Sequence, residues 1–271
     1  MIGKKELSEA LALSCVEKYF LAWLKSEYDV SSLYGYSFVE IKRVLEDFAK
    51  GARYEDYRSV PRVQDTAEDF GITGHSYFPA PQGAPCSPET ALQFIRQQGS
   101  ADLCLIRVNA AYSARFKRSA WRSDHYICVD AQLNWANEYP LSEGRFTEAE
   151  FAQSFGGAIC LYKLKDTRKR SGSDCEKRIK EQDFFDIRPG IGIKKFEDAV
   201  GILRVTRRRM AEYFRTEGKL CELWREECGL LDKLYFDVRM QELRQGGNES
   251  ELYRKINEVI LSERKIAEEM K

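Results

Sequence analysis

The chain has 271 residues, and its 43 basic and 43 acidic side chains give a formal net charge of zero. A chain without net charge has no overall field that would draw it to nucleic acid or to an anionic membrane, so we expect neither as a partner. Hydrophobic residues make up 43% of the chain and charged residues 32%. This composition excludes a disordered or fibrous protein and predicts a globular one.

The sequence shows neither targeting segments nor metal-binding patterns. It has no apolar run of about 18 residues and no apolar N-terminal core of a secretion signal, so we expect a cytoplasmic protein. The eight cysteines are scattered singly, as reduced, buried thiols usually are. The only two histidines, His75 and His125, lie far apart, and Gly190-Ile191-Gly192 lacks the third glycine of a dinucleotide loop. We therefore expect no metal site and no cofactor.

Residues 4–25 are rich in helix formers and carry apolar residues at spacings of three and four, which predicts a helix with one buried face. Cys15 lies in this stretch. If the helix starts at Ser14, the Ser14 side chain caps it and the Cys15 thiol lies in the first turn, where the helix dipole favours a thiolate. If the helix runs unbroken from Leu7, Cys15 lies in its middle and is a small core residue. The sequence leaves both alternatives open.

The next part of the chain is a series of helices and loops. Residues 28–38, which include Tyr34 and Tyr36, read as an aromatic loop. Three further helices are expected over residues 38–50, 62–70 and 89–98. Between the last two lie His75, which we read as a turn residue, and a proline-rich surface crossover that ends at Pro88.

From residue 103 onward the pattern becomes that of strands. The apolar run 103–108 predicts a strand that is buried on both faces. A polar loop that contains Tyr112 leads to a second strand, which His125 opens, and residues 132–137 are able to pair back as a third. A capping box at residues 147–150 predicts a short helix, and residues 158–164 a fourth strand.

The last hundred residues read as a linker followed by helices. Residues 166–194 form a charged linker, and residues 195–271 a helical extension with heptad-like apolar spacing. We expect this extension to bury its apolar stripe against the main domain, residues 1–165, or against another subunit in a homo-oligomer. Its first helix carries a basic cluster that docks an acidic carrier protein or a phosphopantetheine phosphate, or else is a solvated face: Arg204, Arg207, Arg208, Arg209 and Arg215.

Three residues form a candidate catalytic set in the chain order of papain-like thiol enzymes: Cys15, His125 and Asn137. A thiolate attacks an acyl carbon, an imidazole holds and returns the proton, and a third polar group fixes the tautomer of the ring. Twelve residues separate His125 from Asn137, a spacing that a tight hairpin supplies while placing both at one end of adjacent strands. Glu138 is the substitute for Asn137, and Asn134 is a weaker one.

Several segments resemble the N-terminal domain of butirosin biosynthesis protein H and its relatives, a group similar to the bacteriocin-processing cysteine peptidases. They are Ser14-Cys15-Val16-Glu17-Lys18-Tyr19-Phe20-Leu21, Leu33-Tyr34-Gly35-Tyr36, Gly71-Ile72, Leu105-Ile106-Arg107-Val108-Asn109, Asp124-His125-Tyr126 and Asn137-Glu138-Tyr139-Pro140. The resemblance covers residues 10–165 and implies a papain-like α+β fold, with N-terminal helices and an antiparallel sheet. It also implies that an acyl group passes through a thioester, from a carrier-protein thiol to a small-molecule amine in antibiotic biosynthesis.

The sequence departs from the papain-like pattern at one point. Peptidases of this kind place a glutamine before the nucleophile to stabilise the oxyanion, and residues 1–14 contain none. We therefore expect a cysteine-dependent acyltransferase that uses a thioester, whose acyl carbon is already activated, with Tyr34, Tyr36 and Tyr112 as substrate-cleft residues. The alternatives are a catalytically silent binding or assembly protein and a cysteine peptidase that acts on a small peptide. If the three tyrosines do not line a substrate cleft, they are simply half-buried aromatics.

Overall fold

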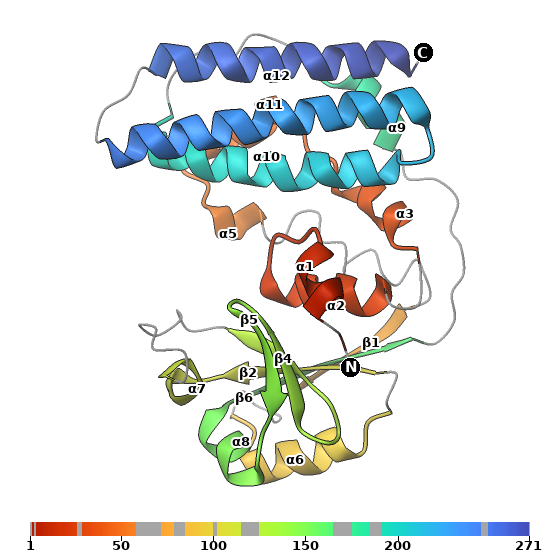
Figure 1. Cartoon of the computed structure of the whole chain (residues 1–271), viewed down its shortest axis with the longest axis vertical. Helices are drawn as coiled ribbons and strands as arrows, with labels where there is room; N and C mark the ends of the chain where they lie inside the picture. The colour runs from red at the N-terminus through yellow and green to blue at the C-terminus, as the bar shows by residue number, and fades with distance from the viewer. Residues whose placement is uncertain are drawn as a thin grey trace. The chain divides into compact units, whose positions relative to one another are not determined.

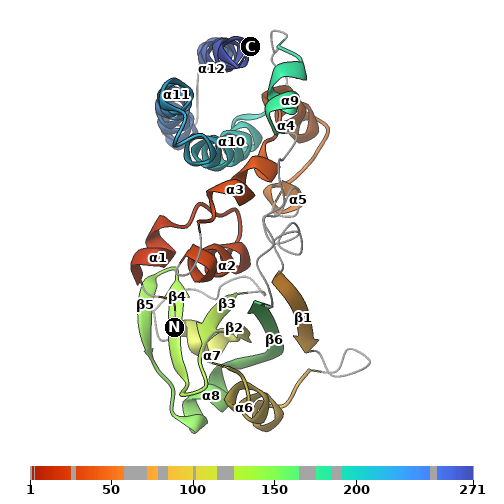
Figure 2. The ribbon, with the colours of Figure 1, turned by 90° about the vertical axis from the view of Figure 1, so that its right-hand side faces the viewer.

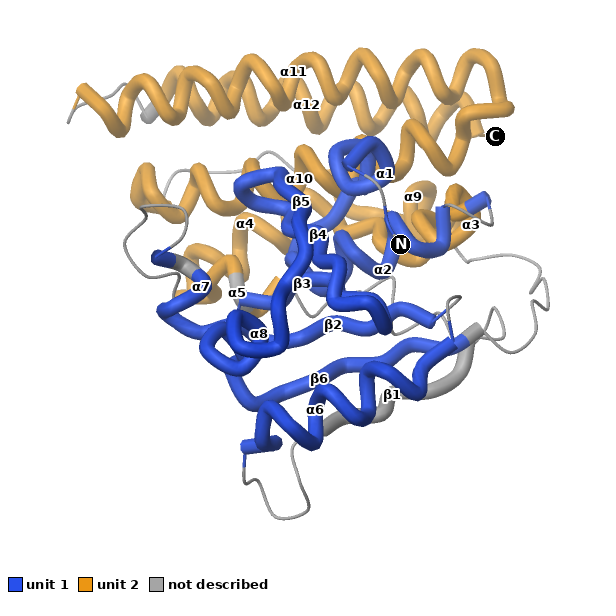
Figure 3. The backbone as a smooth tube through the Cα atoms, turned by 60° about the horizontal axis from the view of Figure 1, so that its bottom comes forward, with its two compact units in different colours: residues 1–29, 66–170 blue, residues 30–65, 171–271 orange. Residues whose placement is uncertain are grey.

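The computed structural model of the chain describes residues 2, 4–25, 29–57, 72–78, 85–99, 102–114, 125–164, 175–184, 191–244 and 249–270. The chain forms two compact units, coloured separately in Figure 3. Unit 1 comprises residues 1–29 and 66–170, and unit 2 comprises residues 30–65 and 171–271. None of the described helices is both long and apolar enough to span a bilayer.

Unit 1 is built on a six-stranded antiparallel sheet with the strand order β1-β6-β2-β3-β4-β5. The strands are β1 (Ile72–Phe78), β2 (Leu103–Val108), β3 (Tyr126–Val129), β4 (Asn134–Glu138), β5 (Leu141–Arg145) and β6 (Phe155–Leu164). The helices are α1 (Lys4–Glu9), α2 (Cys15–Lys25), α6 (Pro88–Arg96), α7 (Ala110–Ala114) and α8 (Glu148–Ser154). The predicted α+β class is confirmed.

Helices cover both faces of this sheet. Ile106, Ile127 and Ile159 face one side and share a core with the apolar residues of α6 and α8. Leu105 and Cys128 point to the opposite side, because neighbouring residues of a strand alternate between faces. Helix α2 packs on this second side (Figures 1 and 2), where it lies against β2, β3 and β4.

Two strands differ from the sequence prediction. β1 contains His75, which we expected in a turn. The backbone of this strand pairs with β6. β5 is an edge strand whose residues are largely exposed, so it lacks the apolar alternation that predicts a strand. Strand pairing with a neighbour, and not local hydrophobicity, makes both segments strands. The helix expected over residues 62–70 lies outside the described residues.

Unit 2 is helical. Its helices are α3 (Ser31–Tyr34), the 3₁₀ helix η1 (Gly35–Ser37), α4 (Ile41–Ala49), α5 (Tyr54–Tyr57), α9 (Cys175–Glu181), α10 (Ile193–Tyr213), α11 (Gly218–Leu243) and α12 (Glu249–Glu269). The three long helices α10, α11 and α12 lie side by side (Figure 1). Their apolar stripe, which includes Leu231, Val238 and Val259, is buried within the unit. Self-association through these helices stays a prediction.

The division into units differs from the expected boundaries of 1–165, 166–194 and 195–271. Residues 30–65 pack with the C-terminal helices, because the buried ring of Phe38 lies against the side chains of later helices. The guanidinium carbon of Arg207 is 4.8 Å from the centre of that ring, and the Trp224 ring is 6.4 Å away. The expected linker also contains α9, whose Cys175 and Ile179 are buried.

The arginines of α10 do not form an open basic surface. Arg207 and Arg209 are fully buried. Arg204 and Arg208 both pair with Asp232, at 2.7 and 2.9 Å, and Arg215 pairs with Glu212. The two buried arginines have no surface for an acidic carrier protein, and docking of such a protein on the other three stays a prediction.

Candidate functional site

The start of helix α2 places Cys15 in the first helical turn. The Glu17 backbone N–H donates to the Ser14 hydroxyl at 3.2 Å, and the Glu17 carboxylate accepts from the Leu13 N–H at 2.7 Å. Ser14 thus caps a helix that begins at Cys15, and Glu17 reaches back across the cap. This settles the alternative that the sequence left open: the thiol lies near the positive end of the helix dipole.

Replacing Ser14 with alanine should lower the free energy of unfolding of unit 1 by about 1 kcal/mol, because a helix N–H loses its acceptor. Urea denaturation followed by circular dichroism measures this change. Ser8→Ala is the matched control, since the exposed Ser8 hydroxyl donates only to the Lys5 carbonyl within α1. Equal stability of the two variants would contradict the assigned cap.

His125 and Asn137 meet at one end of β3 and β4, as the sequence predicts. The His125 Nε2 lies 2.7 Å from the Asn137 Oδ1, and the Asn137 Nδ2 donates to the Pro140 carbonyl at 3.1 Å. A carbonyl only accepts, so the second bond fixes which end of the amide faces the ring. The Asn137 oxygen then requires a proton on Nε2 of the neutral ring. This leaves Nδ1 as the basic nitrogen.

Burial lowers the pKa of His125 below its usual value of 6.5, while the hydrogen bond to Asn137 and the charge of Glu138 oppose this effect. The imidazole is therefore neutral at pH 7, which is the form that accepts a proton. Asn137 is fully buried, so its amide is well placed to hold the ring in one orientation. A neutral, oriented imidazole is what general base catalysis requires.

The two substitutes for Asn137 have other partners. The Asn134 amide donates to Asp130 at 2.8 Å and helps to close the turn between β3 and β4. The Glu138 carboxylate pairs with Lys18 of α2, with 3.4 Å between the charged atoms. Asn137 is therefore the orienting group of His125 in the structure.

Sequence reasoning missed Lys18 and Tyr19 as neighbours of this site. The Glu138 backbone N–H donates to the Tyr19 hydroxyl at 2.9 Å, and burial raises the pKa of Tyr19 well above its usual value. Both residues follow Cys15 at helical spacings of three and four, which place them on the Cys15 side of α2. That spacing could have shown that Lys18 and Tyr19 lie near Cys15. It does not reveal that β4 is the strand they contact.

Cys15 is partly exposed at the start of α2. A thiolate at Cys15 would raise the pKa of both Tyr19 and Cys160, so Cys15 lies near these two side chains. Cys15 therefore lies beside the sheet face that α2 covers. His125 lies just before β3, at the end of this interior strand of the sheet. The pairing of the Cys15 sulfur with the His125 ring stays a prediction.

The three tyrosines expected at a substrate cleft lie in different places. Tyr112 is fully buried in the core of unit 1, where its ring is 5.7 Å from that of Trp135. It packs the core and has no surface to offer a substrate. Tyr34 and Tyr36 belong to unit 2, where Tyr34 is buried beneath the Arg209 guanidinium. For the partly buried Tyr36, substrate contact stays a prediction.

All eight cysteines are free thiols, and only Cys15 and Cys228 are more than marginally exposed. Burial raises the pKa of Cys228 to about 12, so that thiol is unreactive near neutral pH. Within the described ranges, no group of three or more histidine, cysteine, aspartate or glutamate side chains is placed to hold a metal ion.

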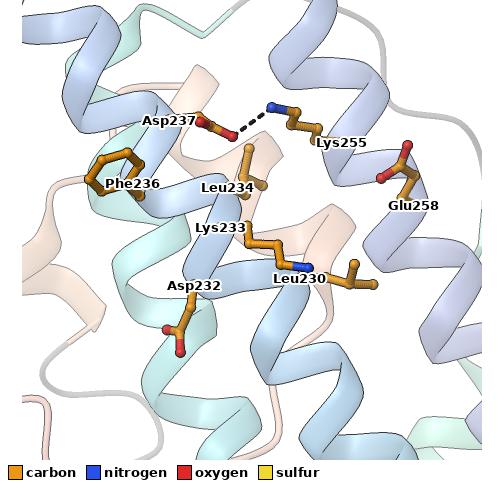
Figure 4. A pocket seen from close by; sticks show the side chains of 8 residues that line it. All are labelled: Leu230, Asp232, Lys233, Leu234, Phe236, Asp237, Lys255 and Glu258. Atoms are coloured by element: carbon orange, nitrogen blue, oxygen red, sulfur yellow. Dashed lines mark hydrogen bonds and ion pairs between the residues drawn. The ribbon is translucent and has the colours of Figure 1, made fainter.

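A surface pocket of about 470 Å³ lies between α11 and α12 of unit 2 (Figure 4). Three of its charged side chains have partners, because Lys255 contacts Asp237 at 2.6 Å and Asp232 binds two arginines of α10. The ring of Phe236 at its rim is 63% exposed. Its lining contains no cysteine, serine, threonine or histidine.

Three comparisons with known proteins gave no match: no family model, no curated protein and no solved structure is significantly similar to this chain.

Proposed function

We propose that this protein is a cysteine-dependent acyltransferase, or a related thioester-processing enzyme, of natural-product biosynthesis, with a papain-like unit 1. Cys15 is the nucleophile, His125 the general base and Asn137 the orienting residue. The observation that carries the proposal is the 2.7 Å contact between His125 Nε2 and Asn137 Oδ1, which directs the basic Nδ1 away from Asn137. The position of Cys15 in the first turn of α2 supports it further.

The reaction proceeds in two steps. Nδ1 of His125 takes the thiol proton as the Cys15 sulfur attacks the acyl carbon of a carrier-bound thioester. The carrier sulfur leaves with that proton, and the acyl group remains on Cys15 as a new thioester. A small-molecule amine then attacks the same carbon, gives a proton to His125 and forms an amide. The proton returns to the Cys15 sulfur, so no oxidant, metal or other cofactor is consumed.

A thioester donor suits this site better than a peptide. Residues 1–14 contain no glutamine that could serve as an oxyanion donor. The loss of one such donor typically costs about 10²–10³ in rate. A thioester tolerates this loss more easily, because its acyl carbon is more electrophilic than that of an amide and thiolate is a good leaving group. We therefore favour transfer from a carrier protein over peptide hydrolysis.

The test uses an acyl N-acetylcysteamine thioester and a panel of small amines, with amide formation followed by mass spectrometry. The proposal predicts that the full chain consumes the thioester and forms an amide, and that Cys15→Ser does neither. Cys228→Ser, which removes the other partly exposed thiol, should retain activity. Cleavage of peptides without thioester consumption would show a peptidase, and inertness toward both would show a binding or assembly protein.

A further inference from the structure

Two contacts join the start of α2 to the residue that follows Asn137. The Tyr19 hydroxyl accepts the backbone N–H of Glu138, and Lys18 pairs with the Glu138 carboxylate. The side chains of Lys18 and Glu138 are only 26% and 19% exposed, and Tyr19 is fully buried. These contacts are therefore partly shielded from solvent. They hold the helix that carries Cys15 against the strand that carries Asn137.

The charges around His125 are few in the described part of the chain. On β4, the charge of Glu138 acts on the ring. From α2, Lys18 partly neutralises Glu138, and Tyr19 stays un-ionised at neutral pH. On the neighbouring strand β2, the Arg107 side chain donates to the Gly156 carbonyl at 2.7 Å. Glu138 thus acts on the His125 ring, and Lys18 is the ion-pair partner of Glu138.

We infer that Glu138 is a positioning residue that acts through His125: it fixes β4 to α2, and its carboxylate stabilises the imidazolium that forms when His125 takes the Cys15 proton. Lys18 limits this stabilisation because its ammonium group offsets the same carboxylate. The inference rests on the proposed function, since it assigns Glu138 a part in the Cys15–His125 proton transfer.

The test is an NMR titration of the histidine C2 protons in the full chain. With only two histidines, His75→Gln assigns the His125 signal directly. Glu138→Gln removes the carboxylate charge and should lower the His125 midpoint. Lys18→Met leaves that carboxylate unscreened and should raise it. Each shift should be on the order of half a pH unit, as expected for one partly solvated charge several ångströms away.

The opposite directions of the two expected midpoint shifts distinguish an electrostatic role of Glu138 from a purely structural one. Both substitutions break the same ion pair, so a purely structural role would move the midpoint in the same direction in both variants. Lys18→Arg keeps the charge and should restore the wild-type midpoint. Shifts of equal sign, or no shift in either variant, would overturn the inference.

The thioester assay distinguishes this failure from failure of the proposed function. If the enzyme is active but the His125 midpoint is unchanged in the Glu138 and Lys18 variants, the inference is overturned. The proposed acyltransferase function is then unaffected. A wild-type chain that consumes no thioester overturns the acyltransferase, and with it the catalytic part of the inference. If both hold, Glu138→Gln should also move the acid limb of the rate profile, where His125 becomes protonated, to lower pH, and Lys18→Met should move it to higher pH.

Discussion

Replacing Arg207 with methionine should destabilise unit 2 by about 3–5 kcal/mol, the typical cost of removing one partner from a buried ionic network. Arg207 is fully buried, and its guanidinium contacts Glu227 at 3.2 Å and Glu263 at 2.9 Å. It also donates to the Val39 carbonyl at 2.7 Å. The variant would leave two carboxyl groups and a carbonyl buried without their cation.

The destabilisation should depend on pH. Burial already raises the pKa of Glu227 and of Glu263, and Arg207 opposes this effect for both. Without Arg207 the folded-state pKa values rise further above the unfolded value. The folded variant then binds more protons than the unfolded one, so its stability is greatest below about pH 4.5 and falls as the pH rises. The loss relative to wild type should therefore be larger at neutral than at acidic pH.

Urea denaturation followed by tryptophan fluorescence measures this loss, because Trp224 lies 5.9 Å from the Arg207 guanidinium. The matched control is Arg208→Met on the same helix. Arg208 is 44% exposed and pairs with Asp232, so its removal should cost less than about 1 kcal/mol. Similar losses for the two variants would contradict the buried network.

Replacing His125 with glutamine should reduce thioester consumption by about 10²–10⁴-fold, the usual contribution of a general base. Glutamine keeps a donor for the Asn137 oxygen, so the buried amide is not left without a partner. It has no basic nitrogen to take the Cys15 proton. The change therefore removes the base and preserves the packing of β3 and β4.

The matched control is His75→Gln, because it removes the only other imidazole of the chain. His75 lies on β1, which β6 and β2 separate from β3 in the sheet. This variant should keep the wild-type rate. A His125→Gln enzyme as active as the control would show that another group accepts the proton.

The sequence predicted the local part of the site and left its tertiary part open. The spacing between His125 and Asn137 predicted that they would meet, because a short hairpin fixes the register of its two strands. That register continues to Asn137 opposite Ile127, so His125 is its diagonal neighbour. The start of α2 was ambiguous, because helix propensity continues upstream of Ser14 and only the hydrogen bonds of the cap decide between the alternatives. The contact between Tyr19 and Glu138 spans 119 residues, and no local pattern encodes it.

The architecture of unit 2 was harder to predict for the same reason. Arginines at helical spacing read as a solvated face, but Arg207 is buried by acceptors from residues 39, 227 and 263. These partners come from segments far apart in the chain, so residues 30–65 could not be assigned to the C-terminal helices from sequence. The α+β class was predictable because it depends on the periodicity of each segment.

The most direct test of whether His125 activates Cys15 is alkylation of the chain by iodoacetamide. Mass spectrometry measures the rate of labelling at each cysteine separately. At about pH 6.5, where an unperturbed thiol is almost wholly protonated, Cys15 should react at least about ten times faster in the wild type than in His125→Gln. Cys228, whose buried thiol is unreactive near neutral pH, should be labelled slowly in both proteins. Equal rates of Cys15 labelling in the wild type and in His125→Gln would contradict the account.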